Sequence, residues 1–180
     1  MAYFLTFSTY GSWFHGKEKG SVDRKNNLPG TPFLKPDPKL ANHERKSCKQ
    51  PSVIFSWKQR KLIERAIGDV CTYNKWMLHA VNARMTHVHV VVSATKSPES
   101  VMNSLKSWCT RKLREELLMP DTIKTWSRHG STRYLWNEKA VHDVCRYVTE
   151  FQDYRPGFKW HHKHALSYGR GGAPESRNTE

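Results

Sequence analysis

The segment that most constrains the fold is residues 85–92, which read MTHVHVVV. The run is rich in β-branched residues and is followed by the turn-forming Lys96-Ser97-Pro98, which together predict a buried strand. Because strand side chains alternate between faces, His87 and His89 point to one side and the alternate valines to the other. Two imidazoles about 7 Å apart along a strand can chelate one divalent metal ion. A pair of half-buried histidines on an ordinary strand is the alternative.

The net charge indicates what the chain binds. Among 180 residues, 30 Lys and Arg stand against 16 Asp and Glu, a formal charge of +14. Such an excess attracts a polyanion by releasing its condensed counterions, so a nucleic acid is the expected partner.

The location of the protein is also suggested by its sequence. No run of 18 apolar residues is present, and the first residues lack the basic leader and long apolar core of a signal peptide. The four cysteines form no C-x-x-C pair, which predicts reduced thiols. We therefore expect a cytoplasmic bacterial protein, associated with the nucleoid and not with a membrane.

Hydrophobic periodicity predicts the order of strands and helices. Strands are expected over residues 2–9, 75–81, 85–92 and 127–136. A capping box at Ser56 and Gln59 precedes a helix over 57–73, Ser97-Pro98 begins a helix that ends near Leu118, and Asn137 caps a last helix. The order is β-α-β-β-α-β-α. Its simplest closure is an α+β fold, a ferredoxin-like four-stranded antiparallel sheet with two helices on one face.

Two segments lack clear periodicity. Residues 11–51 are long for a loop inside a compact domain, which indicates a functional or disordered segment. Trp13 lies there among basic residues, where it could stack on unpaired bases or fold back onto the core. Residues 154–180 form a basic, polar tail that we expect to be mobile. The predicted domain spans 1–153, with a long basic loop over 11–55.

The last predicted helix carries the candidate nucleophile. We expect this helix to lie over the sheet face that bears the two histidines. Asp143, Tyr147 and Glu150 follow one flank of it, since positions three and four apart are neighbours. Tyr147 lies about a third of a turn from the apolar seam, so packing alone does not require it. Two histidines, a facing tyrosine and a basic surface predict nucleophilic phosphoryl transfer on DNA.

These residues resemble a known family. HVH with flanking aliphatic residues, followed by a helix with one tyrosine (CRYVTEFQ), is similar to the HUH single-tyrosine transposases, including the REP-associated tyrosine transposases. The pieces TFSTYGSW, HAVNARMTHVHVVVS and GSTRYLWNEKAVHDVCRYV resemble that family too. The resemblance covers roughly residues 2–153.

The resemblance implies a metal-dependent transposase. His87 and His89 would bind Mg²⁺ or Mn²⁺ at the scissile phosphate of single-stranded DNA that contains hairpins. Tyr147 would attack that phosphate, giving a 5′-phosphotyrosine and a free 3′-OH. Family members tend to place Gln or Asn four residues after the tyrosine, but Phe151 stands there, so Glu150 and Gln152 are both open as the third ligand. The oligomeric state, monomer or homodimer, is also open.

Candidate DNA contacts are mostly basic residues of the second predicted helix, where they are expected on its exposed side, and of the fourth strand. They are Lys106, Arg111, Lys112, Arg114, Arg128 and Arg133, together with Trp13.

Two other classes of phosphoryl-transfer enzyme do not fit the sequence. Histidine-triad nucleotide hydrolases need a third histidine where this chain has Val91, and phosphoesterases with paired H-x-T/S motifs need a second such motif. The remaining alternative is a non-catalytic, domesticated nucleic-acid-binding domain of the same fold.

Overall fold

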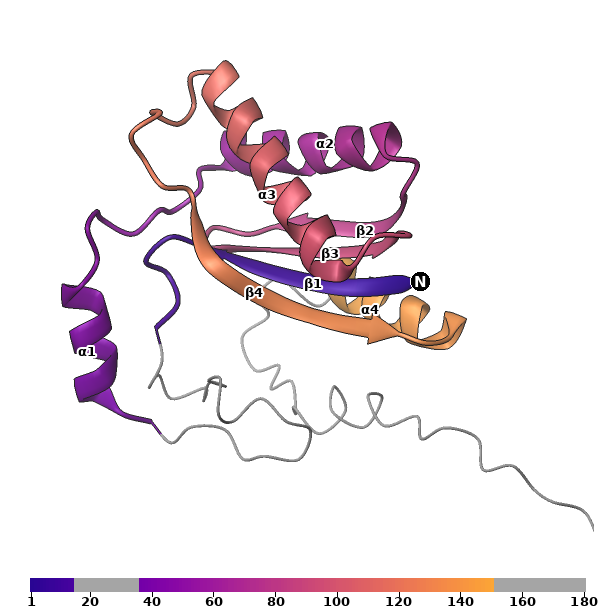
Figure 1. The fold of residues 1–180 in the computed structure, drawn as a ribbon, viewed down its shortest axis with the longest axis horizontal. Helices are drawn as coiled ribbons and strands as arrows, with labels where there is room; N and C mark the ends of the chain where they lie inside the picture. Colours follow the sequence, from indigo (N-terminus) through magenta and orange to yellow (C-terminus); the bar gives the residue numbers. More distant parts are fainter. Residues whose placement is uncertain (15–35, 151–180) are drawn as a thin grey trace, which may run out of the picture.

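The computed structural model describes residues 1–14 and 36–150. Its elements are β1 (Ala2–Thr9), α1 (Pro38–Lys46), α2 (Trp57–Tyr73), β2 (Met77–Ala83), β3 (His87–Ser93), α3 (Pro98–Glu115), β4 (Trp126–Leu135) and α4 (Glu138–Glu150). The strands form one antiparallel sheet in the order β2-β3-β1-β4 (Figure 1). This strand order, with the packed helix α2 between β1 and β2 and α3 between β3 and β4, is ferredoxin-like, as predicted.

Alternation along β3 divides the sheet into two faces. Val88, Val90 and Val92 are fully buried on one face, as the sequence predicts. The register with β1 pairs Leu5 with Val90 on one face and Thr6 with His89 on the other. We call the face that bears His87 and His89 the histidine face. A slip of one residue in this register would exchange the two faces.

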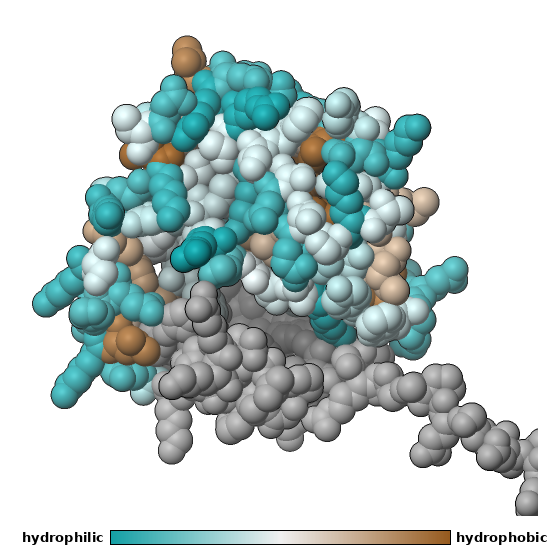
Figure 2. Space-filling view, in the orientation of Figure 1, coloured by the Kyte–Doolittle hydropathy of each residue, from teal (hydrophilic) through white to brown (hydrophobic). Residues whose placement is uncertain are grey.

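Helices α2 and α3 cover the face opposite the histidines (Figure 1). Their apolar residues pack with those of the sheet in the larger hydrophobic cluster, which we call the main core. The predicted capping box begins α2: the Ser56 hydroxyl accepts from the Gln59 backbone amide at 3.3 Å, and the Gln59 side-chain oxygen Oε1 accepts from the Ser56 backbone amide at 2.7 Å. The Gln59 side chain also donates to the Leu118 carbonyl at 2.7 Å, which joins α2 to the end of α3. The face of the molecule seen in the space-filling view is hydrophilic to intermediate, with hydrophobic residues scattered over it (Figure 2).

Helix α4 lies on the histidine face, as predicted. The Asn137 side chain accepts from the Ala140 amide at 2.8 Å and so caps the helix. The helix packs through a smaller cluster, which we call the second cluster. Its buried members are Ala80, Val91, Leu135, Ala140, Val144 and Val148.

Helices α2 and α3 end in the same way, through a residue in the left-handed region. Lys75 has φ 57° and Leu117 has φ 54°. The next amide in each case, that of Trp76 or Leu118, donates at 2.8 Å to a carbonyl five residues back, as in a Schellman motif. The turn at Lys75 explains why β2 begins at Met77 rather than at the predicted residue 75.

Helix α1 departs from the sequence prediction, which treats residues 11–51 as one loop. None of its residues is buried, so it lacks the apolar stripe by which a helix is recognised in a sequence. Its start is stabilised locally: the Asp37 carboxylate accepts from the amides of Lys39 and Leu40 at 2.9 and 3.1 Å. The sequence does carry that signal, an Asp at the N-cap followed by a proline.

The prediction that Lys106 lies on the exposed side of its helix is wrong. Lys106 is only 7% exposed, and its ammonium donates to the carbonyls of Ser127 and His129, each at 3.0 Å. It therefore fastens α3 to the first half of β4. Burial lowers the pKa of Lys106 from 10.5 to about 8.

The C-terminal segment, the cysteines and the lengths of the helices bear on three further predictions. Gln152 and the tail over 154–180 lie outside the described residues, and the boundary at 153 is not tested. Cys48, Cys71, Cys109 and Cys145 are free thiols. Among the helices of residues 36–150, none has the length and apolar character needed to cross a membrane.

Gly130 and Gly68 allow a matched test of packing. A Cβ at Gly130 would lie 2.5 Å from the Thr6 carbonyl oxygen and 2.6 Å from Met102 Sδ, whereas a Cβ at Gly68, in α2, would meet nothing within 4 Å. We expect Gly130→Ala to lower the free energy of unfolding by about 1–3 kcal/mol. We expect Gly68→Ala to raise it by about 0.5–1 kcal/mol, since alanine favours helix. Urea denaturation measures both, and changes of the same sign would contradict the packing described.

Lys106 should give stability an unusual pH dependence. Between pH 8 and 10.5 the folded state loses the Lys106 proton while the unfolded state keeps it, so this group makes stability rise with pH. A neutral amine still has two N–H donors for the two carbonyls. We expect the difference in unfolding free energy between wild type and Lys106→Met to grow as the pH rises above 8. Burial raises the pKa of Cys71 to about 11, which makes stability fall with rising pH. Because this effect is the same in wild type and variant, it cancels in the difference between their unfolding free energies. A constant difference in urea denaturation would contradict this account.

Candidate active site

The two histidines of β3 lie side by side on the histidine face. Their ring centroids are 4.8 Å apart and the ring planes meet at 75°. His89 is 6% exposed, and His87 is half-buried nearer the end of the strand. The sequence prediction that both point to one face is confirmed.

Two residues of β1 fix the His89 ring. The Thr6 hydroxyl forms a 2.8 Å hydrogen bond with His89 Nδ1. The Phe4 ring stacks on the imidazole, with centroids 5.4 Å apart and planes at 28°. Because Thr6 engages Nδ1, any metal bound by His89 would be bound through Nε2.

Tyr147 of α4 reaches the same place from above the sheet. Its ring centroid is 5.9 Å from that of His89 and 6.1 Å from that of Phe4. The ring is half-buried and packs beside the second cluster. Tyr147 is therefore in contact with His89, although the chain separates the two residues by almost 60 positions.

Asn82 of β2 ties the last turns of α4 to the sheet. It stands opposite His89 in the β2–β3 register, and its side-chain amide donates to the Val148 carbonyl at 2.9 Å. This bond anchors the backbone immediately after Tyr147. Asn82 therefore helps to set the distance between the tyrosine and His89.

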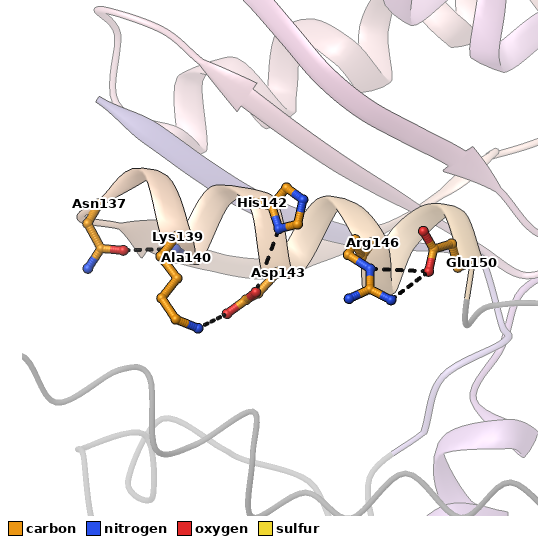
Figure 3. A network of polar contacts seen from close by, with 7 residues as sticks. All are labelled: Asn137, Lys139, Ala140, His142, Asp143, Arg146 and Glu150. Carbon is orange, nitrogen blue, oxygen red and sulfur yellow. Dashed lines mark hydrogen bonds and ion pairs between the residues drawn. The ribbon is translucent and has the colours of Figure 1, made fainter.

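The acidic residues of α4 turn away from the histidines. The Glu150 carboxylate pairs with Arg146 at 3.2 Å, and both are about half exposed (Figure 3). Asp143 pairs with Lys139 at 3.1 Å on the same outer side of the helix, and the Lys139 hydrogen bond lowers the pKa of Asp143. Within residues 1–14 and 36–150, no group of three His, Cys, Asp or Glu side chains could hold a metal. The structure thus does not bring Glu150 to the histidine pair.

The geometry of the histidine pair fits two ligands of one metal ion. Imidazoles that bind at about 2.1 Å in neighbouring positions of an octahedron have ring centres roughly 4.5–5 Å apart. The observed 4.8 Å falls in this range. A hard ion such as Mg²⁺ keeps several water or phosphate oxygens, so two protein ligands do not make the site unsuitable.

The basic residues of α3 lie on the other side of the sheet from the histidines (Figure 1). Arg111 stacks over the Trp108 ring, with its guanidinium carbon 5.4 Å from the centroid. Lys112 pairs with Glu115 at 2.7 Å and Arg114 with Asp121 at 3.2 Å. These cations and the histidine pair therefore belong to different surfaces.

Arg133 differs from the other predicted DNA contacts. It stands opposite Phe4 in the β1–β4 register, which places it on the histidine face. It is half-buried, and burial lowers the pKa of its guanidinium. Arg128 is exposed on β4, and Trp13 is 48% exposed next to Ser12, whose hydroxyl donates to the Thr86 carbonyl beside His87 at 3.1 Å.

Three residues of the site were not found by sequence reasoning: Phe4, Thr6 and Asn82. They owe their places to strand pairing, which the sequence shows only indirectly. The alternation of residues 2–9 does put Phe4 and Thr6 on one face. Pairing this strand with the histidine strand in the ferredoxin-like order would have brought them beside His89.

Comparisons with known proteins agree with the resemblance seen in the sequence. The model of a family described as "Transposase IS200 like" matches residues 45–150. No curated protein matches the chain. A transposase candidate from Deinococcus radiodurans R1 is similar in structure, with 15% identity, TM-score 0.41, and 82% of this chain and 88% of that chain covered. A REP-associated tyrosine transposase bound to a REP hairpin has 11% identity and TM-score 0.43, with 82% and 63% covered.

Both TM-scores are too low for either structure to bear on how this chain works. The family model does not depend on them, and it matches 106 of the 180 residues, a segment that contains the histidine pair and the tyrosine helix. On that match, this chain belongs to the IS200-like transposases, the single-tyrosine family that its sequence resembles.

Proposed function

We propose that this transposase cleaves and rejoins single-stranded DNA through a covalent bond to Tyr147. The contact of the Tyr147 ring with His89, beside His87, is the observation that carries the proposal. A tyrosine and two imidazoles of the kind that bind metal ions come together there from elements distant in sequence. Joint placement of this kind is what nucleophilic catalysis requires.

The proposed step is an in-line displacement at phosphorus. Tyr147 Oη loses its proton and forms a P–O bond, while the bond from phosphorus to the 3′-oxygen breaks and that oxygen gains a proton. The products are a 5′-phosphotyrosine and a free 3′-OH. Because the number of phosphoester bonds is unchanged, the reverse attack by another 3′-OH joins strands without ATP.

His87 and His89 would hold the metal, Mg²⁺ or Mn²⁺. When bound, the ion would polarise the scissile phosphate and stabilise the charge of the leaving 3′-oxygen. Glu150 would serve as a third ligand only after leaving Arg146, and Gln152 is the other candidate. Thr6 and Phe4 hold the His89 ring in place for this task.

The proposed substrate is single-stranded DNA with a hairpin near the cleavage point, recognised by a monomer or a homodimer in the bacterial cytoplasm. The net charge of +14 supports a polyanionic partner. Arg133 would contact DNA phosphates on the Tyr147 side of the sheet; its position on the histidine face supports this role. The cations of α3 and Arg128 would contact the DNA elsewhere.

One observation favours a second candidate, a non-catalytic nucleic-acid-binding domain. Among residues 1–14 and 36–150 no acidic side chain joins the histidine pair, and Glu150 is engaged by Arg146. Such a domain would bind DNA with the same basic surface and leave it intact.

Removal of the tyrosine hydroxyl tests the proposal directly. Labelled single-stranded hairpins from the neighbouring genomic DNA, incubated with Mn²⁺, Mg²⁺ or EDTA, should give a metal-dependent covalent adduct on denaturing gels. We expect the adduct to vanish in Tyr147→Phe, which keeps the ring packing, and in a His87→Ala/His89→Ala double variant. An adduct that persists in Tyr147→Phe would refute the assignment of the nucleophile. Binding of every hairpin without an adduct would leave the second candidate.

The hydrogen bond from Thr6 gives a test of the metal site without DNA. Thr6→Val removes the hydroxyl and keeps the branched shape, while Thr6→Ser keeps the hydroxyl. Because loss of an outer hydrogen-bond partner typically costs roughly 10- to 100-fold in metal affinity, we expect Thr6→Val to weaken Mn²⁺ binding in this range and Thr6→Ser to restore most of it. Titration calorimetry measures both. Equal Mn²⁺ affinity in the two variants would show that Thr6 does not position His89.

A further inference from the structure

Two aromatic rings lie exposed and stacked where β4 meets α4. Tyr134 is 42% and Trp136 64% exposed. Their centroids are 5.3 Å apart and their planes are within 13° of parallel. We call this pair the aromatic platform.

The platform is held from beneath by a buried residue. The Tyr3 ring meets Tyr134 edge-on, with centroids 5.3 Å apart and planes at 85°. Tyr3 is 5% exposed, and its hydroxyl donates to the Lys96 carbonyl at 3.1 Å. On the other side of Trp136, Asn137 caps α4. The rings are therefore fixed by the sheet and by the start of a helix, so stacking on them costs little further ordering.

The surroundings of the platform do not suit a protein partner. Its neighbours along the chain, Arg133, Asn137, Glu138 and Lys139, are polar or charged, so polar side chains border the two rings in the sequence. A stable protein interface needs a larger continuous patch with an apolar centre. A flat pair of parallel rings with polar borders suits a nucleobase, because any base can continue the stack.

We propose that the aromatic platform binds an unpaired base of the substrate strand. This rests on the proposal that the substrate is single-stranded DNA, and it adds a binding site separate from the histidine pair. Leu135 is level with Ala2 and Ser93 in the sheet, whereas His87 is level with Ser8. Six strand residues separate these levels, or about 20 Å. Tyr134 is level with Tyr3, a member of the main core, so the platform lies at the edge strand on the side of the sheet opposite the histidines. The base bound here is therefore remote from the cleaved phosphate, at least on the order of six stacked nucleotides away at 3.4 Å each.

The test measures binding without cleavage. Trp136→Ala and Tyr134→Ala are made in the Tyr147→Phe background, and their affinities for labelled single-stranded hairpin DNA are compared by fluorescence anisotropy at several salt concentrations. Trp57→Ala is the matched control, because Trp57 is 67% exposed and has no ring partner among the described residues. Urea denaturation verifies that each variant is folded.

We expect Trp136→Ala to weaken binding roughly 5- to 150-fold, the loss of one base–aromatic stack. Trp136→Phe should retain part of the affinity, Trp57→Ala should bind as the parent does, and the salt dependence should not change, because no phosphate contact is lost. Unchanged affinity in Trp136→Ala, or an equal loss in Trp57→Ala, would overturn the proposal. So would unchanged DNA affinity with altered self-association, which would indicate a protein contact. None of these outcomes depends on whether Tyr147 forms an adduct.

Discussion

The pairing of β1 with β3 in a single register is the constraint on which the rest of the structure depends. It places Leu5 beside Val90 and Thr6 beside His89, so the same two strands build a dry core on one side and a polar site on the other. The core side fixes the register, because a slip of one residue would bury the histidines among apolar helices. The free energy that holds the site in place thus comes from residues that never touch a substrate.

The sheet also separates two kinds of basic surface. The cations of α3 pair with neighbouring acids or cover an aromatic ring, and they lie behind the sheet from the tyrosine. Arg133, by contrast, shares the histidine face. Lys106 shows that a basic residue can have a structural role: its side chain joins α3 to β4 through hydrogen bonds to two carbonyls. The net charge of a protein therefore indicates the class of its partner, but not which basic residues bind that partner.

Strong local signals made most of the fold predictable. Strict alternation over 2–9, the capping box at Ser56 and the histidine strand gave the order of elements, and the topology followed from it. Predictions failed where structure depends on few or distant contacts. Helix α1 has no buried face, Lys106 is buried by a strand 20 residues away, and Thr6 acquires its role only through pairing across 83 residues. Helical spacing also could not predict that Glu150 pairs with Arg146 on the exposed flank and does not approach the histidines.

The two clusters of the described residues are unequal in a way that affects the tyrosine helix. The main core has 24 buried members and the second cluster six, so α4 is attached by much less apolar contact than α2 and α3. Local opening of α4 therefore requires less free energy than unfolding of the domain, and its amide hydrogens should exchange with solvent earlier. Any strand that binds against Tyr147 adds contacts to this weakly attached helix. By mass action, the proposed substrate would then help to hold the proposed nucleophile in position.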